Sequence, residues 1–266
     1  MKIHNKILLS EIDYLNSLQI REIKVFNQIT INKILFLQKT FMKNGYFLAK
    51  KILSKELCEL CQSIIIFDNS TKNDDRQFYR NHNVKNDNSE KLISIIHEFL
   101  NKLFSLIMNR NLFNTYSFAM NYIKGSDMDP HYDLLLNSIS ATVVFKGSNS
   151  YNPIFIDKAL FGNPYTHRLT IKDKSSIPVE NIIELNADFC DIVCFRGREH
   201  LHWRNKINFD EDYRAFLVHF TDYSFNGKIL QAPTEFFGIK HQLIDLNNYI
   251  DFRNHYAMFF DPTSKY

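Results

Sequence analysis

The spacing of apolar residues changes from a helical to a strand-like pattern near the middle of the chain. Over residues 1–43 apolar side chains recur three or four positions apart, as at Ile12, Leu15 and Leu18, which is typical of amphipathic helix. Asn44-Gly45 should end this segment. The run Tyr46–Ala49 predicts a short strand.

Two more helices are predicted before the pattern changes. Ser54 is suited to cap a helix that runs to about Phe67. Residues 68–89 are polar and rich in Asn and Asp, which favours a loop. Ser89 begins a second pattern, whose single apolar stripe predicts a helix packed on a sheet. The stripe consists of Leu92, Ile96, Phe99, Leu103 and Ile107.

From Ser117 onward, short apolar runs separated by turn residues predict a mainly β architecture, a sandwich or barrel with flanking helices. The predicted strands are 117–124, 139–146, 153–158, 181–186, 190–196, 200–204 and 214–222. Residues 147–180 form a polar insertion of the kind that often carries substrate contacts.

No internal repeat or flexible linker divides the chain, so one domain is expected over residues 1–266. It would comprise a helical segment at 1–43, a β core at 44–222 and a helix-and-loop extension at 223–266.

Composition narrows the possible functions. The net charge of +3 comes from 32 basic and 29 acidic residues, a balance that argues against nucleic acid as a partner. No apolar run reaches the length of a membrane span. Cys58, Cys61, Cys190 and Cys194 do not form a disulfide framework. We therefore expect a cytoplasmic protein with reduced cysteines and no membrane partner.

The most informative motif is His131-Tyr132-Asp133. Side chains two residues apart on a strand point to the same side, so His131 and Asp133 would face one pocket. They would form two thirds of the 2-His-1-carboxylate set that binds non-haem Fe(II) and leaves coordination positions open. The motif gains weight only if a second histidine follows.

Two histidines compete for the third ligand position. His202 is favoured because Leu201-His202-Trp203 continues a strand, whereas His200 lies nearer the turn at Gly197. His200 stays open as the alternative ligand.

Arg214 follows on the next predicted strand and precedes the apolar run Ala215–Val218. A buried arginine needs an anionic partner, and its planar fork suits a carboxylate. No partner is evident nearby in the sequence, which indicates an organic acid as ligand. His219 has the opposite parity on this strand, and we expect it to face away from the pocket.

Other side chains are weaker candidates. Tyr122 and Asn121 lie on the strand leading to the first motif, and Tyr122 could offer a hydroxyl to a co-substrate or simply belong to the aromatic core. Four basic residues could contact a small anionic substrate, namely Arg80, His167, Arg168 and Arg204.

Taken together, these motifs resemble the Fe(II)/2-oxoglutarate-dependent dioxygenases, and more specifically their phytanoyl-CoA hydroxylase-like branch or its near relatives. The resemblance covers roughly residues 44–222. Its first piece is the Gly-Tyr strand and the start of the Ser-capped helix in residues 44–54. The second piece is Tyr122-x-x-Gly125 followed by Pro130-His131-x-Asp133. The third piece consists of Asp191–Phe195, Gly197, Leu201-His202, Asn205 and Arg214-Ala215.

The resemblance implies a double-stranded β-helix, a cupin-like jelly roll. It implies His131, Asp133 and His202 as Fe(II) ligands, and Arg214 as the partner of the distal carboxylate of 2-oxoglutarate. O₂ and 2-oxoglutarate would be consumed, giving succinate and CO₂ while a C–H bond of a small molecule is hydroxylated or desaturated. Phe216 departs from the pattern, because some branches have serine there, and the gap between Asp133 and His202 is long.

Because the family's halogenases have a small residue in place of the carboxylate ligand, Asp133 argues against halogenation. Two other classes of function stay open. Three N/O ligands with an open position also suit a zinc hydrolase, although such an enzyme has no need of Arg214. A non-catalytic jelly-roll binding protein is the third hypothesis.

Overall fold

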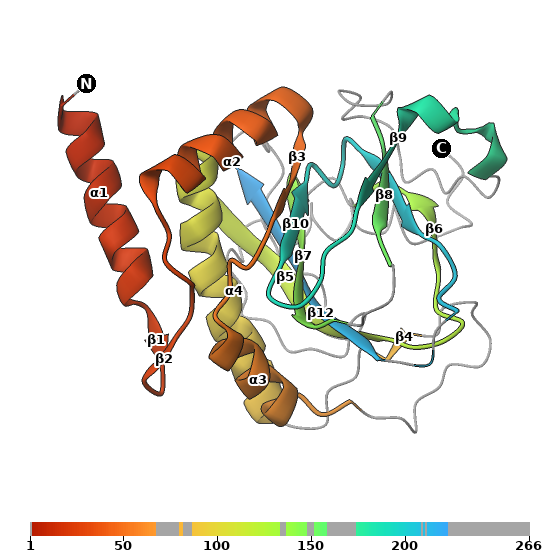
Figure 1. Cartoon of the computed structure of the whole chain (residues 1–266), viewed down its shortest axis with the longest axis horizontal. Coiled ribbons are helices and arrows are strands. Elements are labelled where there is room, and N and C mark those ends of the chain that lie inside the picture. Colours follow the sequence, from red (N-terminus) through yellow and green to blue (C-terminus); the bar gives the residue numbers. More distant parts are fainter. Residues whose placement is uncertain are drawn as a thin grey trace, which may run out of the picture.

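The core of the molecule consists of two antiparallel β-sheets that face each other, with helices on the outer side of the larger sheet (Figure 1). The computed structural model describes residues 2–67, 80–81, 87–133, 137–147, 152–158, 174–208, 210 and 212–222. Most of the polar insertion and the whole extension at 223–266 lie outside the described residues, so the predictions made for them stay predictions.

Four helices form the layer outside the larger sheet. They are α1 (Lys2–Ser17), α2 (Ile31–Asn44), α3 (Lys55–Ile64) and α4 (Asp87–Met108). Capping residues seen in the sequence mark the end of α2 and the start of α3, whereas α4 begins two residues before the predicted Ser89. Gly45 adopts a φ of 80° and closes α2 through its N–H and the carbonyl of Phe41, a conformation that glycine adopts without steric cost. Ser54 caps α3 by accepting from the Leu57 N–H. Both predicted boundaries are confirmed.

The N-terminal segment is not wholly helical. Between α1 and α2 the chain forms a two-stranded hairpin of β1 (Gln19–Ile20) and β2 (Ile23–Lys24). Arg21 and Glu22 make the turn with φ values of 50° and 68°. Because neither residue favours positive φ, the sequence carries no turn signal here.

The β core has the connectivity of a double-stranded β-helix. The larger sheet contains, in spatial order, β3 (Tyr46–Ala49), β10 (Ile192–Phe195), β7 (Ile139–Lys146), β12 (Tyr213–Asp222), β5 (Leu112–Tyr122) and β4 (Arg80–Asn81). The smaller sheet contains β6 (Met128–His131), β11 (Leu201–Arg204), β8 (Ile154–Asp157) and β9 (Ile182–Leu185). All these pairings are antiparallel, and the chain passes repeatedly between the two sheets, as the predicted jelly roll requires.

Each face of the larger sheet has its own apolar core. On the outer face, Phe216 and Val218 of β12 pack with residues of the helices such as Ile96, which confirms the role of the α4 stripe. On the inner face, Tyr213 and Ala215 pack against the smaller sheet. Residues on β12 therefore alternate between the helical layer and the barrel interior.

The smaller sheet is covered on its outer side by the short helices η1 (Lys174–Ser176) and η2 (Val179–Asn181) and the residues around them. Ile177 packs there against Leu201 and Trp203 of β11. Leu201 and Trp203 thus point out of the barrel, and the alternate residues His202 and Arg204 point into it.

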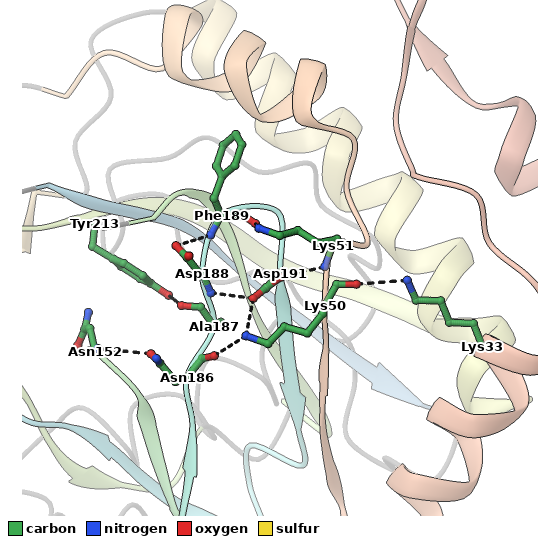
Figure 2. Close-up of polar contacts among 10 residues, drawn as sticks. All are labelled: Lys33, Lys50, Lys51, Asn152, Asn186, Ala187, Asp188, Phe189, Asp191 and Tyr213. Carbon is green, nitrogen blue, oxygen red and sulfur yellow. Dashed lines mark hydrogen bonds and ion pairs between the residues drawn. The ribbon is translucent and has the colours of Figure 1, made fainter. Parts of the chain in front are cut away.

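One buried carboxylate fixes the turn that leads into β10 (Figure 2). Asp191 is 1% exposed. Its Oδ1 accepts from the backbone N–H of Lys51 at 2.8 Å, and its Oδ2 accepts from the N–H of Asp188 at 2.9 Å and from Lys50 Nζ at 2.8 Å. The end of β3 is thereby tied to the 186–191 turn. Within this turn, the Ala187 carbonyl accepts from the Tyr213 hydroxyl at 3.1 Å.

All four cysteines are buried and unpaired by disulfides, as expected. None of the helices in the described part of the chain has the length and apolar character needed to cross a membrane.

Candidate metal centre

Three side chains converge at one end of the smaller sheet, where His202 of β11 lies directly opposite His131 of β6. Asp133 follows two residues after His131. One ligand atom from each of the three lies within 4.8 Å of the others. The strand register brings together the two histidines that the sequence separates by 71 positions, as the prediction of a 2-His-1-carboxylate set requires.

The hydrogen bonds of the two imidazoles select the ring nitrogen that would bind a metal. The Nδ1 atom of His131 lies 2.7 Å from the Asp129 carbonyl, and that of His202 lies 2.9 Å from the His200 carbonyl. Because a carbonyl only accepts, both Nδ1 atoms carry a proton, which leaves the Nε2 atoms as the ones available to bind a metal. These Nε2 atoms lie 3.8 and 3.6 Å from Asp133 Oδ1. The donor set therefore fits a divalent first-row metal such as Fe(II).

The carboxylate of Asp133 is held so that one oxygen faces the histidines. Its Oδ2 accepts from the Ser140 hydroxyl of β7 at 2.5 Å, and its backbone N–H donates to the Gly197 carbonyl at 2.9 Å. A Cβ at Gly197 would overlap both Asp133 Oδ2 and the Ser140 side chain. Gly197 therefore allows the carboxylate to approach the backbone, a role that the sequence did not reveal beyond a strand break.

Electrostatics keep this carboxylate ionised. Burial by itself would raise the pKa of Asp133, but the imidazoles of His202, His219 and His131 outweigh it and hold the pKa below its ordinary value. An anionic oxygen that faces the Nε2 atoms of two imidazoles is the donor arrangement that a divalent cation needs.

We predict that Gly197→Ala will weaken metal binding by about 10- to 100-fold, the usual effect of losing a residue that orients a ligand. The added methyl must displace Asp133 or Ser140. Titration of Ni(II) into the apo protein by calorimetry measures the change.

Gly147→Ala provides the matched control, because a Cβ there would overlap Asp188, at the opposite end of β7 from Ser140. Gly147→Ala should lower the free energy of unfolding and leave metal affinity unchanged. Equal metal affinity in Gly197→Ala and the wild type would contradict the role given to Gly197.

The other candidate histidines lie apart from the three ligands. His200 is fully buried, with its Nδ1 3.4 Å from the Asp157 carbonyl and its ring against Tyr46, and it does not belong to the converging group. Burial lowers the pKa of His200 to about 4. His202 is therefore the histidine that the fold brings to His131 and Asp133.

His219 does not face away from the site, in contrast to what was expected. It is paired with Ser140, the residue that holds Asp133, and its ring lies 4.2 Å from that of Tyr116 on the inner face. Burial lowers the pKa of His219 to about 4, so its imidazole is neutral near pH 7. Arg214 and His219 lie on opposite faces of β12, as predicted. However, His219 faces the barrel interior and Arg214 faces outward, which is the reverse of the expected arrangement.

Arg214 lies on the outer face of β12. Its guanidinium is 5.4 Å from the centre of the Phe67 ring, and its Nη2 forms an ion pair of 2.8 Å with Asp212. Asn121, its partner across β5, has the same parity and shares this outer face. The described structure thus separates Arg214 and Asn121 from the barrel interior, and Asp212, two residues before Arg214, supplies the carboxylate that the sequence reading did not find.

Tyr122 and Arg204 do point into the barrel. The Arg204 guanidinium lies 5.0 Å from the centre of the Tyr122 ring and 5.1 Å from that of Tyr213. The Arg80 side chain and all of His167 and Arg168 lie outside the described residues.

Comparison with known proteins supports the fold. No protein-family model matches the chain, and no curated protein matches it. Similar solved structures include EctD from S. alaskensis with 2-oxoglutarate and 5-hydroxyectoine, at 12% identity and a TM-score of 0.55, covering 87% of this chain and 89% of that one.

A second similar structure is HygX from Streptomyces hygroscopicus with nickel, 2-oxoglutarate and hygromycin B, at 10% identity and a TM-score of 0.53, covering 82% of this chain and 98% of that one. A third is a 2OG-Fe(II) oxygenase family protein from Burkholderia pseudomallei, at 10% identity and a TM-score of 0.52, covering 78% of this chain and 97% of that one. At such low identity the shared feature is the architecture. The chain has the double-stranded β-helix fold that 2-oxoglutarate oxygenases use.

Proposed function

We propose that this protein is an Fe(II)- and 2-oxoglutarate-dependent oxygenase that hydroxylates a C–H bond of a small, polar or anionic molecule, while 2-oxoglutarate is converted to succinate and CO₂. The observation that carries the proposal is the convergence of His131, Asp133 and His202, with both Nδ1 atoms bonded to carbonyls and both Nε2 atoms available to bind a metal. Three protein ligands leave positions open for a chelating co-substrate and O₂.

A bound Fe(II) would supply the activation of O₂, and the chain's own residues would hold and surround it. Ser140 and Gly197 fix the carboxylate of Asp133. The ring of Phe195 lies 4.5 Å from that of His202, which limits access of water on that side. Retention of Asp133, rather than a small residue, favours hydroxylation over halogenation.

The wall of the barrel beside Asp133 supports a polar small molecule as substrate. There the Tyr116 hydroxyl accepts from Asn137 Nδ2 at 2.7 Å, and the neutral ring of His219 packs on Tyr116. These groups offer hydrogen bonds within a buried surface, as small-molecule sites usually do. The similar structures EctD and HygX contain 5-hydroxyectoine and hygromycin B, both small polar molecules.

Incubation with Fe(II), ascorbate, O₂ and 2-oxoglutarate tests the proposal through the formation of succinate, with and without a cell extract as a source of substrate. An anaerobic sample with Fe(II) and 2-oxoglutarate should show a weak visible charge-transfer band. Absence of both the band and succinate would overturn the proposal, and Zn²⁺-dependent hydrolysis in the same preparation would favour the hydrolase alternative.

A further inference from the structure

We propose that Arg204, rather than Arg214, receives the distal carboxylate of 2-oxoglutarate. This inference rests on the proposed function and names the residue that would select the co-substrate. Arg204 lies on β11 two residues after His202, so both side chains point into the barrel from one strand.

Arg204 is a buried cation with incomplete hydrogen bonding. It is 1% exposed, its Nη1 donates to the Asn152 carbonyl at 2.6 Å, and neither its Nε nor its Nη2 has a hydrogen-bond partner. Among the ion pairs of the described residues, none involves Arg204. A buried charge without a counter-ion is costly, so the site is built for an anion.

The shape of the guanidinium fits a carboxylate. Nε and Nη2 share one edge of the planar group, so the two nitrogens without partners can donate in parallel to the two oxygens of one carboxylate. The rings of Tyr122 and Tyr213 lie near the guanidinium and restrict its orientation. The Tyr213 ring is itself fixed, since its hydroxyl donates to the Ala187 carbonyl in the turn that Asp191 holds (Figure 2).

Tyr213 cannot replace the missing counter-ion. Burial raises the pKa of Tyr213 to about 12, which keeps its hydroxyl neutral near pH 7. Among the residues that the structure describes, no carboxylate pairs with Arg204, so we assign its counter-ion to a ligand.

The position of Arg204 suits a short diacid anchored at the metal. Residues two apart on a strand are separated by about 7 Å, comparable to the length of a five-carbon dicarboxylate. Across the strand pair, His202 lies opposite His131 and Arg204 lies opposite Met128. Arg204 is therefore displaced from the ligands in the direction away from Asp133, which leaves the Asp133 side for the substrate.

Arg214 differs from Arg204 in its position and in its charge partner, although its Nε also lacks a hydrogen-bond partner. It lies on the outer face of the larger sheet and already has the carboxylate of Asp212 as a partner, which also pairs with Lys146 at 3.6 Å. A ligand carboxylate would have to displace Asp212 to reach it.

The test compares two ligands that differ only at the distal group, 2-oxoglutarate and 2-oxopentanoate, in which a methyl replaces the carboxylate. Calorimetry of the full chain loaded with Ni(II) gives both affinities without turnover. We expect the wild type to prefer 2-oxoglutarate by about 100-fold or more. Arg204→Met should lose this preference, and Arg214→Met, the matched control, should keep it.

Folding is checked with the same variants. Unliganded Arg204→Met should melt at or above the wild-type temperature, because the substitution removes an uncompensated buried charge. If Arg204→Met does not fold, Arg204→Lys should reduce the preference for 2-oxoglutarate by about 10-fold, since the parallel pair of donors is lost.

Three outcomes would decide against the proposals. Full preference in Arg204→Met, or in Arg204→Lys where the methionine variant does not fold, would overturn the assignment to Arg204. Loss of the preference in Arg214→Met alone would return the role to Arg214. Failure of the wild type to bind either 2-oxo acid with metal present would instead overturn the proposed oxygenase function.

Discussion

Replacing His202 by alanine is expected to abolish metal-dependent turnover of 2-oxoglutarate and to lower metal affinity by more than about 100-fold. Changes to residues that only orient a ligand already cost about 10- to 100-fold, and His202 would supply one of the three ligand atoms. Titration of the apo variant with Ni(II) and the assay of succinate measure the two effects.

His200→Gln is the matched control, because His200 lies only two residues before His202 and was the alternative candidate for the third ligand. It is buried against Tyr46, so its replacement should cost stability without reducing metal affinity. If His200→Gln loses the metal and His202→Ala keeps it, the ligand set of His131, Asp133 and His202 is wrong.

Replacing Asp191 by alanine should lower the free energy of unfolding by about 3 kcal/mol, a large share of the stability of a typical domain. The change removes the acceptor of two backbone N–H groups, those of Lys51 and Asp188. A buried donor without a partner costs about 1–3 kcal/mol. Urea unfolding followed by circular dichroism measures the loss.

Lys50→Ala separates the ion pair from these backbone contacts. The Lys50 side chain is 57% exposed, so water screens its attraction to Asp191, and we expect a loss below about 1 kcal/mol. Equal losses in the two variants would show that the ion pair, rather than the acceptance of backbone hydrogen bonds, makes Asp191 important.

The sequence predicted most elements because their signals are local. The side chain of Ser54 caps the start of α3, and the backbone of Gly45 ends α2. The predicted strands correspond to β5, β7, β8, β9, β10, β11 and β12, although β5 begins at Leu112 rather than Ser117 and other ends shift by one or two residues. The β1–β2 hairpin was missed, because its turn at Arg21 and Glu22 has no glycine or asparagine.

The cluster of His131, Asp133 and His202 was also predictable, because His131 and Asp133 are close in sequence and the family-like order placed His202 on a later strand. Gly197 was not, because its role depends on Asp133 and Ser140, which reach it only through the pairing of strands. A close approach between distant segments leaves no local pattern in the sequence.

By itself, the sequence determined which residues of a strand share a face. It placed Arg214 and His219 on opposite faces of one strand, because alternation is a property of the extended backbone. Only the tertiary structure decided which face is the interior. The helical layer packs on the side of Phe216 and Val218, and the smaller sheet packs on the side of Tyr213 and Ala215. That choice depends on long-range packing, and it places Arg214 outside the barrel. In the same way, the packing of Ile177 on Leu201 and Trp203 places Arg204 inside it.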